Sequence, residues 1–483
     1  MEHYMNFIDG ERRTPSKGEY SPIIDPRTEK ELAKVARSDS EDVEAAFAAA
    51  KAAFPRWSGH TAAQRQHAVL SIADKIEENA ELISSVESEN TGKPQGFVHE
   101  EEVDVAVDVL RFFSGTIRTA LAPAAGEYMT KYTSYVRREP LGVCVQMVPF
   151  NYPLLMAVWK LAPALAAGNT IVLKPSHNTP MSVLLLAELV SDVLPRGTIN
   201  VLCGDREATA DITRHTAAQH VSATASTASG LAIANSALTS VKRLHLGLGG
   251  KSPAIVFPDA DLPHAARRIA QAAYFNGGQD CTAASRVLVA SDVHDEFVAE
   301  LSRQVACMVN AGPEDENTAS YGPLNSKGQL GRIIRTLEEL PEHAEVAVGG
   351  QRIDRPGLFF PPTLVTGVTS SDSVVHTELF GPVATVERFT SEQDVVSLVN
   401  SADYGLAASV HTHDHSTAMR VSSNLDYGCV WINTHLPLPS EMPHGGFKQS
   451  GFGKDLSLYG IDEFTRVKHV MHMIEDDSSP ETG

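Results

Sequence analysis

Short apolar runs and longer helical stretches alternate along most of this chain. The runs T-I-V-L-K at 170–174 and R-V-L-V-A at 286–290 are typical of strands buried on both faces. Helices are predicted over stretches such as 181–194 and 262–274. Strands that alternate with helices form parallel sheets covered on both faces. We therefore predict an α/β protein with two doubly wound parallel-sheet domains, one on each side of about residue 250.

The amino-terminal region adds short strands and a group of helices. Strands are expected up to residue 40, followed by helices after Ser40, over 61–90 and over 99–113. The last of these helices is acidic, because Glu101, Asp104 and Asp108 stand at spacings of three and four on one face. Such a charge run favours a solvated face, and the alternative is a negative lip that attracts a cationic substrate.

Composition and charge narrow the class of protein. The 483 residues are 42% hydrophobic and 21% charged, which is ordinary for a globular protein of two or three domains. The formal net charge of -20 argues against nucleic acid and anionic membrane surfaces as partners. We find no signal peptide and no apolar stretch long enough to span a bilayer. Five scattered cysteines argue against a disulfide framework and favour a reducing cytoplasm.

One cysteine has the surroundings of a nucleophile. Cys281 lies in N-G-G-Q-D-C-T-A-A-S-R at 276–286, where small neighbours allow a bound molecule to approach its side chain. A structural cysteine more often lies in an apolar run, as Cys144 does in L-G-V-C-V-Q-M-V. From the spacing alone an inert thiol is the alternative, because most free cysteines are unreactive. We interpret Cys281 as the candidate nucleophile.

The sequence lacks the common phosphate-binding motifs. There is no G-x-G-x-x-G between a strand and a helix, and G-L-G-G-K-S at 247–252 lacks the first glycine of a P-loop, since His245 occupies its place. Ser226 and Thr227 begin a helix after H-V-S-A-T, where they either bind a diphosphate or cap the helix. H-T-H-D-H at 411–415 indicates a solvated loop, so no metal site is predicted.

Several stretches taken together resemble the NAD(P)-dependent aldehyde dehydrogenase superfamily. They are P-F-N-Y-P at 149–153, L-K-P-S at 173–176, L-G-G-K at 248–251, N-G-G-Q-D-C at 276–281, E-L-F-G-P-V at 378–383 and H-G-G-F-K-Q-S-G-F-G-K-D at 444–455. Q-D-C-T-A-A-S-R and S-E-M-P-H-G-G-F-K-Q-S-G are most similar to the branch that oxidises ω-aminoaldehydes such as 4-aminobutyraldehyde. Betaine-aldehyde enzymes are the neighbouring possibility.

The resemblance implies how the chain is divided. The expected parts are a dinucleotide-binding domain (1–120 and 141–250), a catalytic domain (251–448) and a β extension (121–140 and 449–474). The extension would support a homodimer or homotetramer. Residues 475–483 are polar and are predicted to be a disordered tail.

The resemblance also implies a mechanism and a cofactor. Cys281 as thiolate would attack the aldehyde, while the Asn151 amide and the Cys281 backbone N–H hold the oxyanion. Hydride then passes to NAD or NADP and leaves a thioester that water hydrolyses. Lys174 and Ser176 would contact the adenine ribose. The residues expected at the cofactor are Val148, Pro149, Phe150, Lys174, Ser176, His177, Gly204, Thr224, Ala225, Ser226, Thr227, Leu248, Glu378 and Phe380.

The chain departs from the family at the water and cofactor sites. Gly247 stands where L-E-L-G-G-K has the glutamate that activates water, so the base is absent from this position. Ala223 and Ala225 replace the phenylalanine and glycine of F-T-G-S, and the Ala225 methyl group would crowd the diphosphate unless the helix start shifts. His177 replaces an acidic residue, which removes repulsion against a 2′-phosphate and makes NADP more acceptable.

Three hypotheses follow from Gly247. In the first, Asp455 after G-F-G-K is a substitute base. In the second, the thioester persists until coenzyme A or the substrate's own amine captures it. In the third, the chain is a non-redox homologue that acts as a binding or assembly partner. We expect a cytoplasmic aldehyde dehydrogenase of the aminoaldehyde type with impaired or rerouted hydrolysis, whose amine is attracted by Glu101, Asp104 and Asp108.

Overall fold

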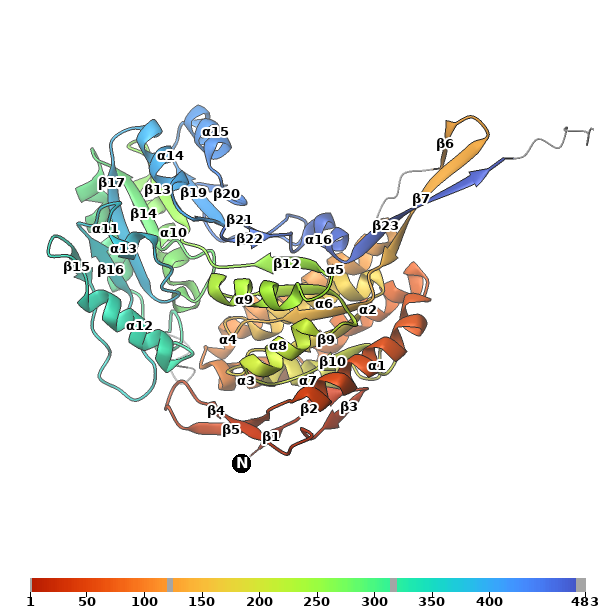
Figure 1. Ribbon diagram of the computed structural model, residues 1–483. Helices are drawn as coiled ribbons and strands as arrows, with labels where there is room; N and C mark the ends of the chain where they lie inside the picture. Colours follow the sequence, from red (N-terminus) through yellow and green to blue (C-terminus); the bar gives the residue numbers. More distant parts are fainter. Residues whose placement is uncertain (1, 120–124, 313–318, 475–483) are drawn as a thin grey trace, which may run out of the picture.

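The computed structural model describes residues 2–119, 125–312 and 319–474. Within these ranges the chain folds into two α/β bodies side by side, and a narrow β arm projects from one of them (Figure 1). Both bodies are built on a largely parallel sheet. The predicted α/β fold with two such sheets is therefore confirmed.

The first body contains a sheet in the order β22-β12-β11-β8-β9-β10-β2-β3, in which the strands from β12 to β10 are parallel. β22 and β2 pair antiparallel with the outermost parallel strands. The strands are β2 (Asn6–Ile8), β3 (Glu11–Arg13), β8 (Val143–Met147), β9 (Thr170–Lys174), β10 (Ile199–Val201), β11 (Ala218–Thr224), β12 (Arg243–Gly247) and β22 (Gly451–Phe452). A small sheet beside it contains β1 (His3–Tyr4), β4 (Tyr20–Ile24) and β5 (Glu31–Ala36).

Helices on the two faces of this sheet bury separate apolar layers. One face is covered by α1 (Ser40–Ser58), α8 (Arg206–Arg214) and α9 (Thr227–Ala237). The other is covered by α6 (Pro153–Ala167) and α7 (Met181–Leu189), with an outer layer of α2 (Ala62–Glu78), α3 (Ala80–Thr91) and α5 (Asp104–Thr119). The short helix α4 (Gln95–Val98) and the π-helical turn η1 (His99–Val103) connect α3 to α5.

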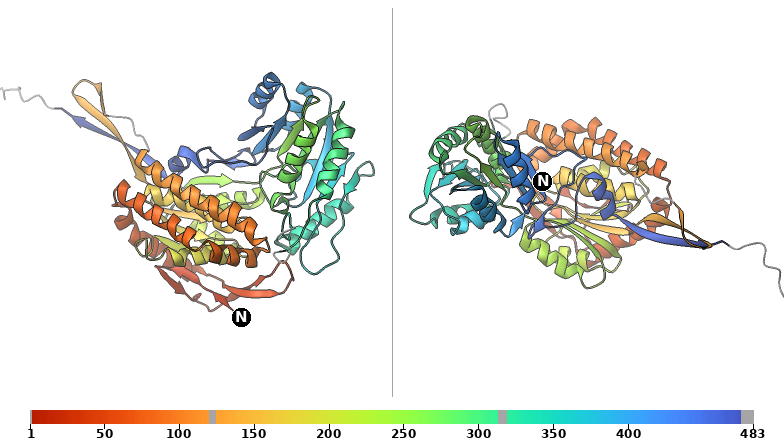
Figure 2. Two further views of the ribbon diagram at one scale, coloured as in Figure 1. Left: turned by 180° about the vertical axis from the view of Figure 1, so that it is seen from behind. Right: turned by 90° about the horizontal axis from the view of Figure 1, so that it is seen from above.

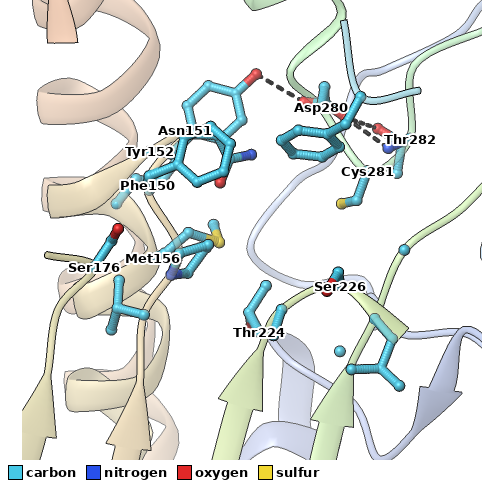
Figure 3. Close-up of a pocket in the computed structure, with 18 of the residues that line it drawn as sticks. Phe150, Asn151, Tyr152, Met156, Ser176, Thr224, Ser226, Asp280, Cys281 and Thr282 are labelled. Carbon is cyan, nitrogen blue, oxygen red and sulfur yellow. Dashed lines mark hydrogen bonds between the residues drawn. The ribbon is translucent and has the colours of Figure 1, made fainter. Parts of the chain in front are cut away.

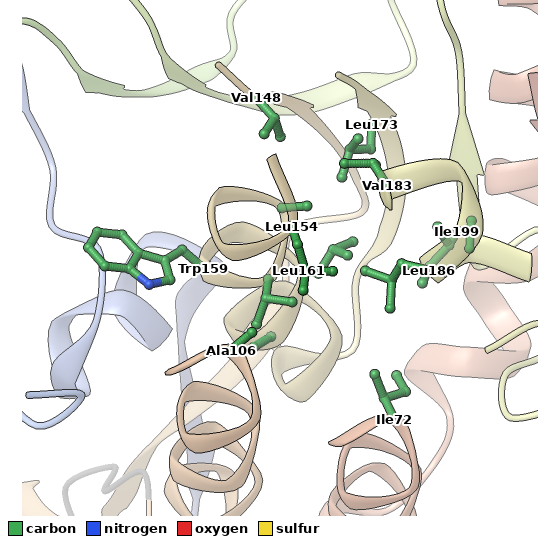
Figure 4. Packing of buried hydrophobic residues seen from close by; sticks show 14 of the residues in the cluster. Ile72, Ala106, Val148, Leu154, Trp159, Leu161, Leu173, Val183, Leu186 and Ile199 are labelled. Atoms are coloured by element: carbon green, nitrogen blue, oxygen red, sulfur yellow. The ribbon is translucent and has the colours of Figure 1, made fainter. Parts of the chain in front are cut away.

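Helix α6 is at the centre of the larger apolar layer because it is apolar on nearly every side. All of its residues are buried, and Leu154 and Leu161 pack near α5 and α7 (Figure 4). Pro153 begins the helix, where a missing N–H loses no helical bond, and Gly168 ends it with a φ of 99°. Burying one such leucine stabilises the fold by roughly 1.5–3 kcal/mol. The segment just before α6 is therefore attached to a helix that is held firmly in place.

The second body contains a sheet in the order β15-β16-β17-β14-β13-β19-β20, parallel except at β15. Helices α10 (Leu262–Tyr274) and α11 (His294–Ala306) cover one face, and α14 (Glu392–Asn400) and α15 (His415–Asn424) cover the other. The strands are β13 (Pro253–Val256), β14 (Arg286–Ala290), β15 (Glu345–Val348), β16 (Thr363–Thr366), β17 (Val383–Phe389), β19 (Ala407–His411) and β20 (Cys429–Ile432). The remaining elements are η2 (Phe275–Gly278), α12 (Lys327–Glu338), α13 (Ser373–His376), β18 (Tyr404–Gly405) and β21 (Phe447–Lys448).

The arm is a three-stranded antiparallel sheet (Figure 2). β6 (Gly126–Met129) and β7 (Tyr132–Pro140) form a hairpin, and β23 (Thr465–Met473) follows α16 (Ser457–Glu463) and pairs along the whole of β7. The arm covers 126–140 and 465–473 of the predicted β extension, whereas the part that begins at 449 differs from the prediction, because β22 pairs with β12 in the sheet of the first body. The role of the arm in oligomerisation stays a prediction. Positions 121–124 of that extension and the predicted tail at 475–483 lie outside the described residues.

Besides α7, which ends at Leu189 and not at residue 194, two helix predictions differ from the structure. The helix expected over 61–90 divides into α2 and α3 at Asn79, which leaves helical geometry (φ -113°, ψ 19°) and donates from its side chain to the Lys75 carbonyl at 2.8 Å. The acidic segment expected over 99–113 begins as the π-helical turn η1 and continues as α5 to Thr119. Both differences arise where an otherwise helical pattern changes its hydrogen bonding.

Candidate active site

A cavity of about 1240 Å³ lies where the two bodies meet. The carboxyl ends of β8, β9, β11 and β12 reach it through Met147, Lys174, Thr224 and Gly247. Ligands of open α/β sheets bind at this edge. Because an ordinary small-molecule site has roughly 300–1,000 Å³, the cavity has room for a dinucleotide and a second, smaller molecule.

The loop that carries Cys281 is shaped by unusual backbone geometry between α10 and β14. Asn276, Gly277 and Gly278 have positive φ values of 49°, 65° and 66°. A Cβ at position 278 would lie 2.2 Å from the Gly381 carbonyl oxygen, so this close approach requires glycine. The loop leaves Cys281 half-buried at the wall of the cavity (Figure 3).

Electrostatics around Cys281 favour the thiol over the thiolate. Burial raises the pKa of Cys281 well above its ordinary value, and the carboxylates of Asp280, Glu378 and Asp455 raise it further. A hydrogen bond from its own backbone N–H acts in the opposite direction. Because the thiolate is the nucleophilic form, Cys281 needs a base or a nearby cation before it can react.

The predicted oxyanion donor lies beside the nucleophile. Asn151 immediately precedes the α6 region and donates from Nδ2 to the carbonyl oxygen of Gln279 at 2.9 Å. Asn276 Nδ2 in turn donates to the Asn151 carbonyl oxygen at 3.0 Å. These bonds tie the two loops together. An amide carries two N–H groups, so Asn151 has a second one for an oxyanion.

Asp280 is a functional candidate that the sequence analysis did not single out. The Tyr152 hydroxyl donates to its Oδ2 at 2.7 Å, and the backbone N–H and hydroxyl of Thr282 donate to its Oδ1 at 2.7 and 2.6 Å (Figure 3). Asp280 lines the cavity, and it directly precedes the nucleophile Cys281 in the sequence. The signal lies in the motif Q-D-C, because a carboxylate beside a catalytic cysteine opposes thiolate formation and calls for a role of its own.

Position 247 leaves open space beside Asp455. A Cβ at this position would meet Thr224 Oγ1 at 3.4 Å and Asp455 Oδ2 at 3.8 Å, which are ordinary contacts. Asp455 is 6% exposed and lines the cavity. The predicted substitute base thus faces the place from which the absent glutamate would extend.

Asp455 belongs to a buried polar cluster. Its Oδ1 lies 3.7 Å from Lys160 Nζ, and its Oδ2 lies 3.6 Å from His245 Nε2. Lys160 Nζ also donates to Ser222 Oγ at 3.0 Å. Burial acts to raise the pKa of Asp455, but the charge of Lys160 opposes it, so the pKa is lowered and the group is a carboxylate at neutral pH. Burial lowers the pKa of His245 to about 4, which keeps that ring neutral.

Most of the residues predicted at the cofactor line the same cavity. They are Val148, Pro149, Phe150, Lys174, Ser176, Thr224, Ala225, Ser226, Leu248, Glu378 and Phe380. Among the described lining residues, His177, Gly204 and Thr227 do not occur. Ser226 caps α9 by accepting from the Ser229 N–H at 3.3 Å, and it also lines the cavity at the amino end of that helix.

The chemistry of these groups fits a dinucleotide. The amino end of α9 at Ser226 carries the partial positive charge that attracts phosphate. Glu378 accepts from the Gly250 N–H at 3.0 Å, and burial raises the pKa of its carboxyl group to about 7. A carboxyl group can accept hydrogen bonds from ribose hydroxyls. The rings of Phe150 and Phe380 meet edge to face, with centroids 5.6 Å apart, and provide an apolar wall.

The three acidic residues predicted to attract an amine do not stay together. Glu101 lies on η1 and lines the cavity, and burial raises its pKa. Asp104 is exposed, 3.9 Å from His99, and Asp108 accepts from Ser440 Oγ at 2.6 Å. The change from π-helical to α-helical winding between Glu101 and Asp104 explains why the expected common face is not kept.

Other sequence signals also have places in the fold. His411 is buried in β19 and Asp414 caps α15, so the prediction of a solvated loop at 411–415 is wrong for this part of the segment. Over the described residues, no group of three or more His, Cys, Asp or Glu side chains is placed to hold a metal ion. In the same ranges, every helix is too short or too polar to cross a membrane.

Such a site, with a half-buried cysteine beside space for a dinucleotide, is typical of an oxidoreductase. Comparison with known proteins supplies the family. The chain belongs to the aldehyde dehydrogenase family, whose sequence pattern matches residues 13–470. It is an NAD(P)-dependent aldehyde dehydrogenase.

Relatives with known activities resemble the chain along nearly its whole length. It is 38% identical over 473 residues to betaine aldehyde dehydrogenase of Bacillus subtilis, covering 96% of each chain. It is 36% identical over 485 residues to human retinal dehydrogenase 2, covering 98% of this chain and 92% of that one. Its structure matches betaine aldehyde dehydrogenase of Staphylococcus aureus in complex with NAD+ with a TM-score of 0.95 at 35% identity, over 99% of this chain and 97% of that one.

Proposed function

We propose that the enzyme oxidises ω-aminoaldehydes such as 4-aminobutyraldehyde to the acids, and that Asp455 activates the water that hydrolyses the thioester. The observation that carries the proposal is the position of Asp455. This ionised, buried carboxylate lies 3.8 Å from the point where a side chain at 247 would begin. A base is needed there, and Asp455 is the acidic residue that faces the space.

Two carboxylates support an amine on the substrate. Asp280 lies beside Cys281, and Glu101 lines the same cavity. An ammonium group forms charge-assisted hydrogen bonds with such carboxylates. The rings of Tyr152 and Trp159 also line the cavity, and aromatic faces attract cations. A cationic aldehyde is therefore favoured over a neutral aldehyde of the same length.

The acylation step uses Cys281 and Asn151. A substrate ammonium group beside Asp280 neutralises a carboxylate that raises the pKa of Cys281, and so favours the thiolate. The sulfur attacks the aldehyde carbon, and the Asn151 amide and Cys281 backbone N–H donate to the oxygen as it gains negative charge. Bound NAD or NADP supplies the acceptor for the hydride.

The hydrolysis step uses Asp455. Its carboxylate removes a proton from a water molecule that attacks the thioester carbon, and the Cys281 sulfur leaves as the acid forms. Lys160 stabilises the carboxylate and lowers its pKa. A base of low pKa is less effective than one near the working pH. Release of the acyl group is therefore expected to be the slow step.

Cofactor choice and assembly complete the proposal. Both NAD and NADP are accepted, because the residue after the cavity-lining Ser176 is His177, which brings no carboxylate that would repel a 2′-phosphate bound there. Homodimers or homotetramers form through the arm, whose β23 leaves Val467 63% exposed and Met473 51% exposed. Apolar surface of this kind is typical of protein interfaces.

The test is pre-steady-state NADH formation with 4-aminobutyraldehyde, followed by intact-mass analysis of the quenched protein. The wild-type enzyme is expected to give a burst of about one NADH per site and an acyl adduct on Cys281. Asp455→Asn is expected to keep the burst and to lower the later steady rate by about 10²-fold, a typical contribution of a positioned base. Asp192→Asn, at a carboxylate whose side chain is 67% exposed, is the matched control.

Two outcomes would overturn parts of this mechanism. Acid formed by Asp455→Asn at the wild-type rate would remove Asp455 as the base. Turnover that requires added coenzyme A, or release of a lactam, would show that another nucleophile captures the thioester.

A further inference from the structure

A cluster of three ionisable side chains lies beneath the oxyanion loop. Glu87 is on α3, Lys93 is in the turn after α3, and Glu102 is on η1. Their exposed fractions are 0%, 4% and 0%. None of the three occurs among the described residues that line the cavity, so the cluster lies outside the site assigned above.

The cluster holds the segment 151–154 at both ends. Lys93 Nζ donates to the carbonyl oxygen of Asn151 and, at 2.5 Å, to Glu102 Oε1. At the other end of the segment, the Leu154 N–H donates to Glu87 Oε2 at 3.0 Å. The ammonium group also lies 4.6 Å from the centre of the Tyr152 ring. These contacts reach Asn151, Tyr152 and Leu154, and Pro153 lies between the last two, so the whole segment is held.

Stability alone is a weak explanation for such a cluster. Moving a charged group out of water costs several kcal/mol even in a real protein, and buried ion pairs can often be replaced by apolar residues without loss of stability. Lys93 pairs with Glu102, and burial together with the nearby Glu87 carboxyl group raises the pKa of Glu102 well above its ordinary value. The cluster does fix the orientation of the Asn151 peptide group, because its carbonyl oxygen accepts hydrogen bonds from both Lys93 and Asn276 and cannot rotate freely.

We infer that Lys93 and Glu102, supported by Glu87, are positioning residues that aim the Asn151 amide at the reacting aldehyde. The inference rests on the proposed role of Asn151 as oxyanion donor. Lys93 fixes the Asn151 carbonyl, Glu102 fixes Lys93, and Glu87 fixes the start of α6. A misplacement of about 1 Å can reduce a rate by about 10²-fold, and loss of an oxyanion donor by about 10²–10³-fold.

The π-helical turn is part of this arrangement. Glu101 and Glu102 are neighbours on η1, yet Glu101 lines the cavity whereas Glu102 is buried against Lys93. One turn thus carries a group that can meet the substrate and a group that supports the oxyanion site. π-Helical turns are frequent at functional sites.

The test compares four full-length variants: Lys93→Met, Lys93→Arg, Glu102→Gln and the control Glu100→Gln. Glu100 is the exposed neighbour on the same turn. Three quantities are measured: the NADH burst rate at saturating aldehyde, KM, and the rate of Cys281 alkylation by iodoacetamide. Lys93→Met is expected to slow the burst by about 10–10²-fold, with KM and alkylation changed by less than about threefold. Glu102→Gln, which removes the carboxyl group that Lys93 meets but not the bulk, is expected to slow the burst by about three- to tenfold.

If the orientation of the Asn151 amide is the cause, Lys93→Arg should partly restore the burst rate. The burst rate of Glu100→Gln should stay within about twofold of wild type. The decisive comparison uses Asn151→Ala. Adding Lys93→Met to this variant should slow the burst no further, because the group being positioned is already absent. An additive loss, or an equal loss of alkylation, would overturn the inference in favour of a general structural role. If Lys93→Met does not fold, Glu102→Gln gives the same comparison. A normal burst in Asn151→Ala would overturn the role of Asn151 as oxyanion donor. A slow burst in Asn151→Ala, together with a normal burst in Lys93→Met and Glu102→Gln, would leave that role standing and overturn only the positioning role of the cluster.

Discussion

Replacement of Gly247 by glutamate is expected to accelerate hydrolysis of the acyl-enzyme. The new Cβ would lie 3.4 Å from Thr224 Oγ1 and 3.8 Å from Asp455 Oδ2, so neighbouring atoms have no need to move. Glycine within a strand is less favourable than alanine by roughly 0.5–1 kcal/mol. A side chain at this end of β12 is therefore not expected to destabilise the fold.

The magnitude follows from the two carboxyl groups that the substitution brings together. Like charges at close range oppose each other's ionisation, so the introduced group takes a raised pKa beside Asp455. A base whose pKa is near the working pH is more effective than one whose pKa is depressed. We expect deacylation to become about 10- to 100-fold faster, which corresponds to about 1.4–2.7 kcal/mol of activation free energy.

Decay of the acyl adduct after removal of free aldehyde, followed by intact-mass analysis, measures this step alone. Gly247→Gln supplies the same bulk without a base, and Gly247→Ala tests whether the space is open. A glutamate variant no faster than the glutamine variant would refute the assignment of position 247 to water activation. A smaller burst in Gly247→Ala would refute the claim that the space is free.

Three further predictions concern charge at the cavity or next to it. Asp280→Asn should raise KM for 4-aminobutyraldehyde by about 10–100-fold, because the ammonium group loses its partner. KM for butyraldehyde, which has no ammonium group, should rise by less than about threefold. Equal changes for the two aldehydes would contradict the assignment of Asp280 to the ammonium group. His177→Glu should lower kcat/KM for NADP at least about tenfold through repulsion of the 2′-phosphate and leave NAD nearly unchanged, as steady-state kinetics with both cofactors can show. Burial raises the pKa of Glu378 from 4.5 to about 7, so its contribution to stability is complete below about pH 4.5 and is lost as the pH rises through about 7. Tm should therefore fall less between about pH 5 and 8 in Glu378→Gln than in the wild type, and an equal fall would count against a raised pKa.

Local patterns predicted the large elements well, because most strands of both sheets are buried on both faces. β9 and β14 are continuous apolar runs, and each is followed in the sequence by turn or helix signals. The division between α2 and α3 was not predictable in the same way. Asn79 interrupts the helix through its own backbone angles and a bond to Lys75, while the apolar spacing continues across it.

Some residues of the candidate site could likewise be predicted from the sequence, and others could not. Cys281 stands in a run of small and polar residues that is visible in the sequence, whereas Asn151 stands in P-F-N-Y-P and is identified only through the resemblance to the family. Lys93 and Glu102 stand in charged stretches that are typical of solvated surfaces. Their burial is decided by α6 and the Asn151 loop, which come much later in the chain, so no local pattern predicts it.

The arm is completed only after the long stretch of chain between β7 and β23 has been synthesised. β7 pairs with β23, and the ion pair between Glu139 and Lys468 joins residues 329 positions apart. At roughly 5–20 residues per second, β7 waits on the order of 15–65 s for its partner during translation. A strand edge without a partner is a template for pairing with other chains. Nascent chains therefore carry an edge open to aggregation until Thr465–Met473 appears, and truncation before Thr465 would leave that edge open permanently.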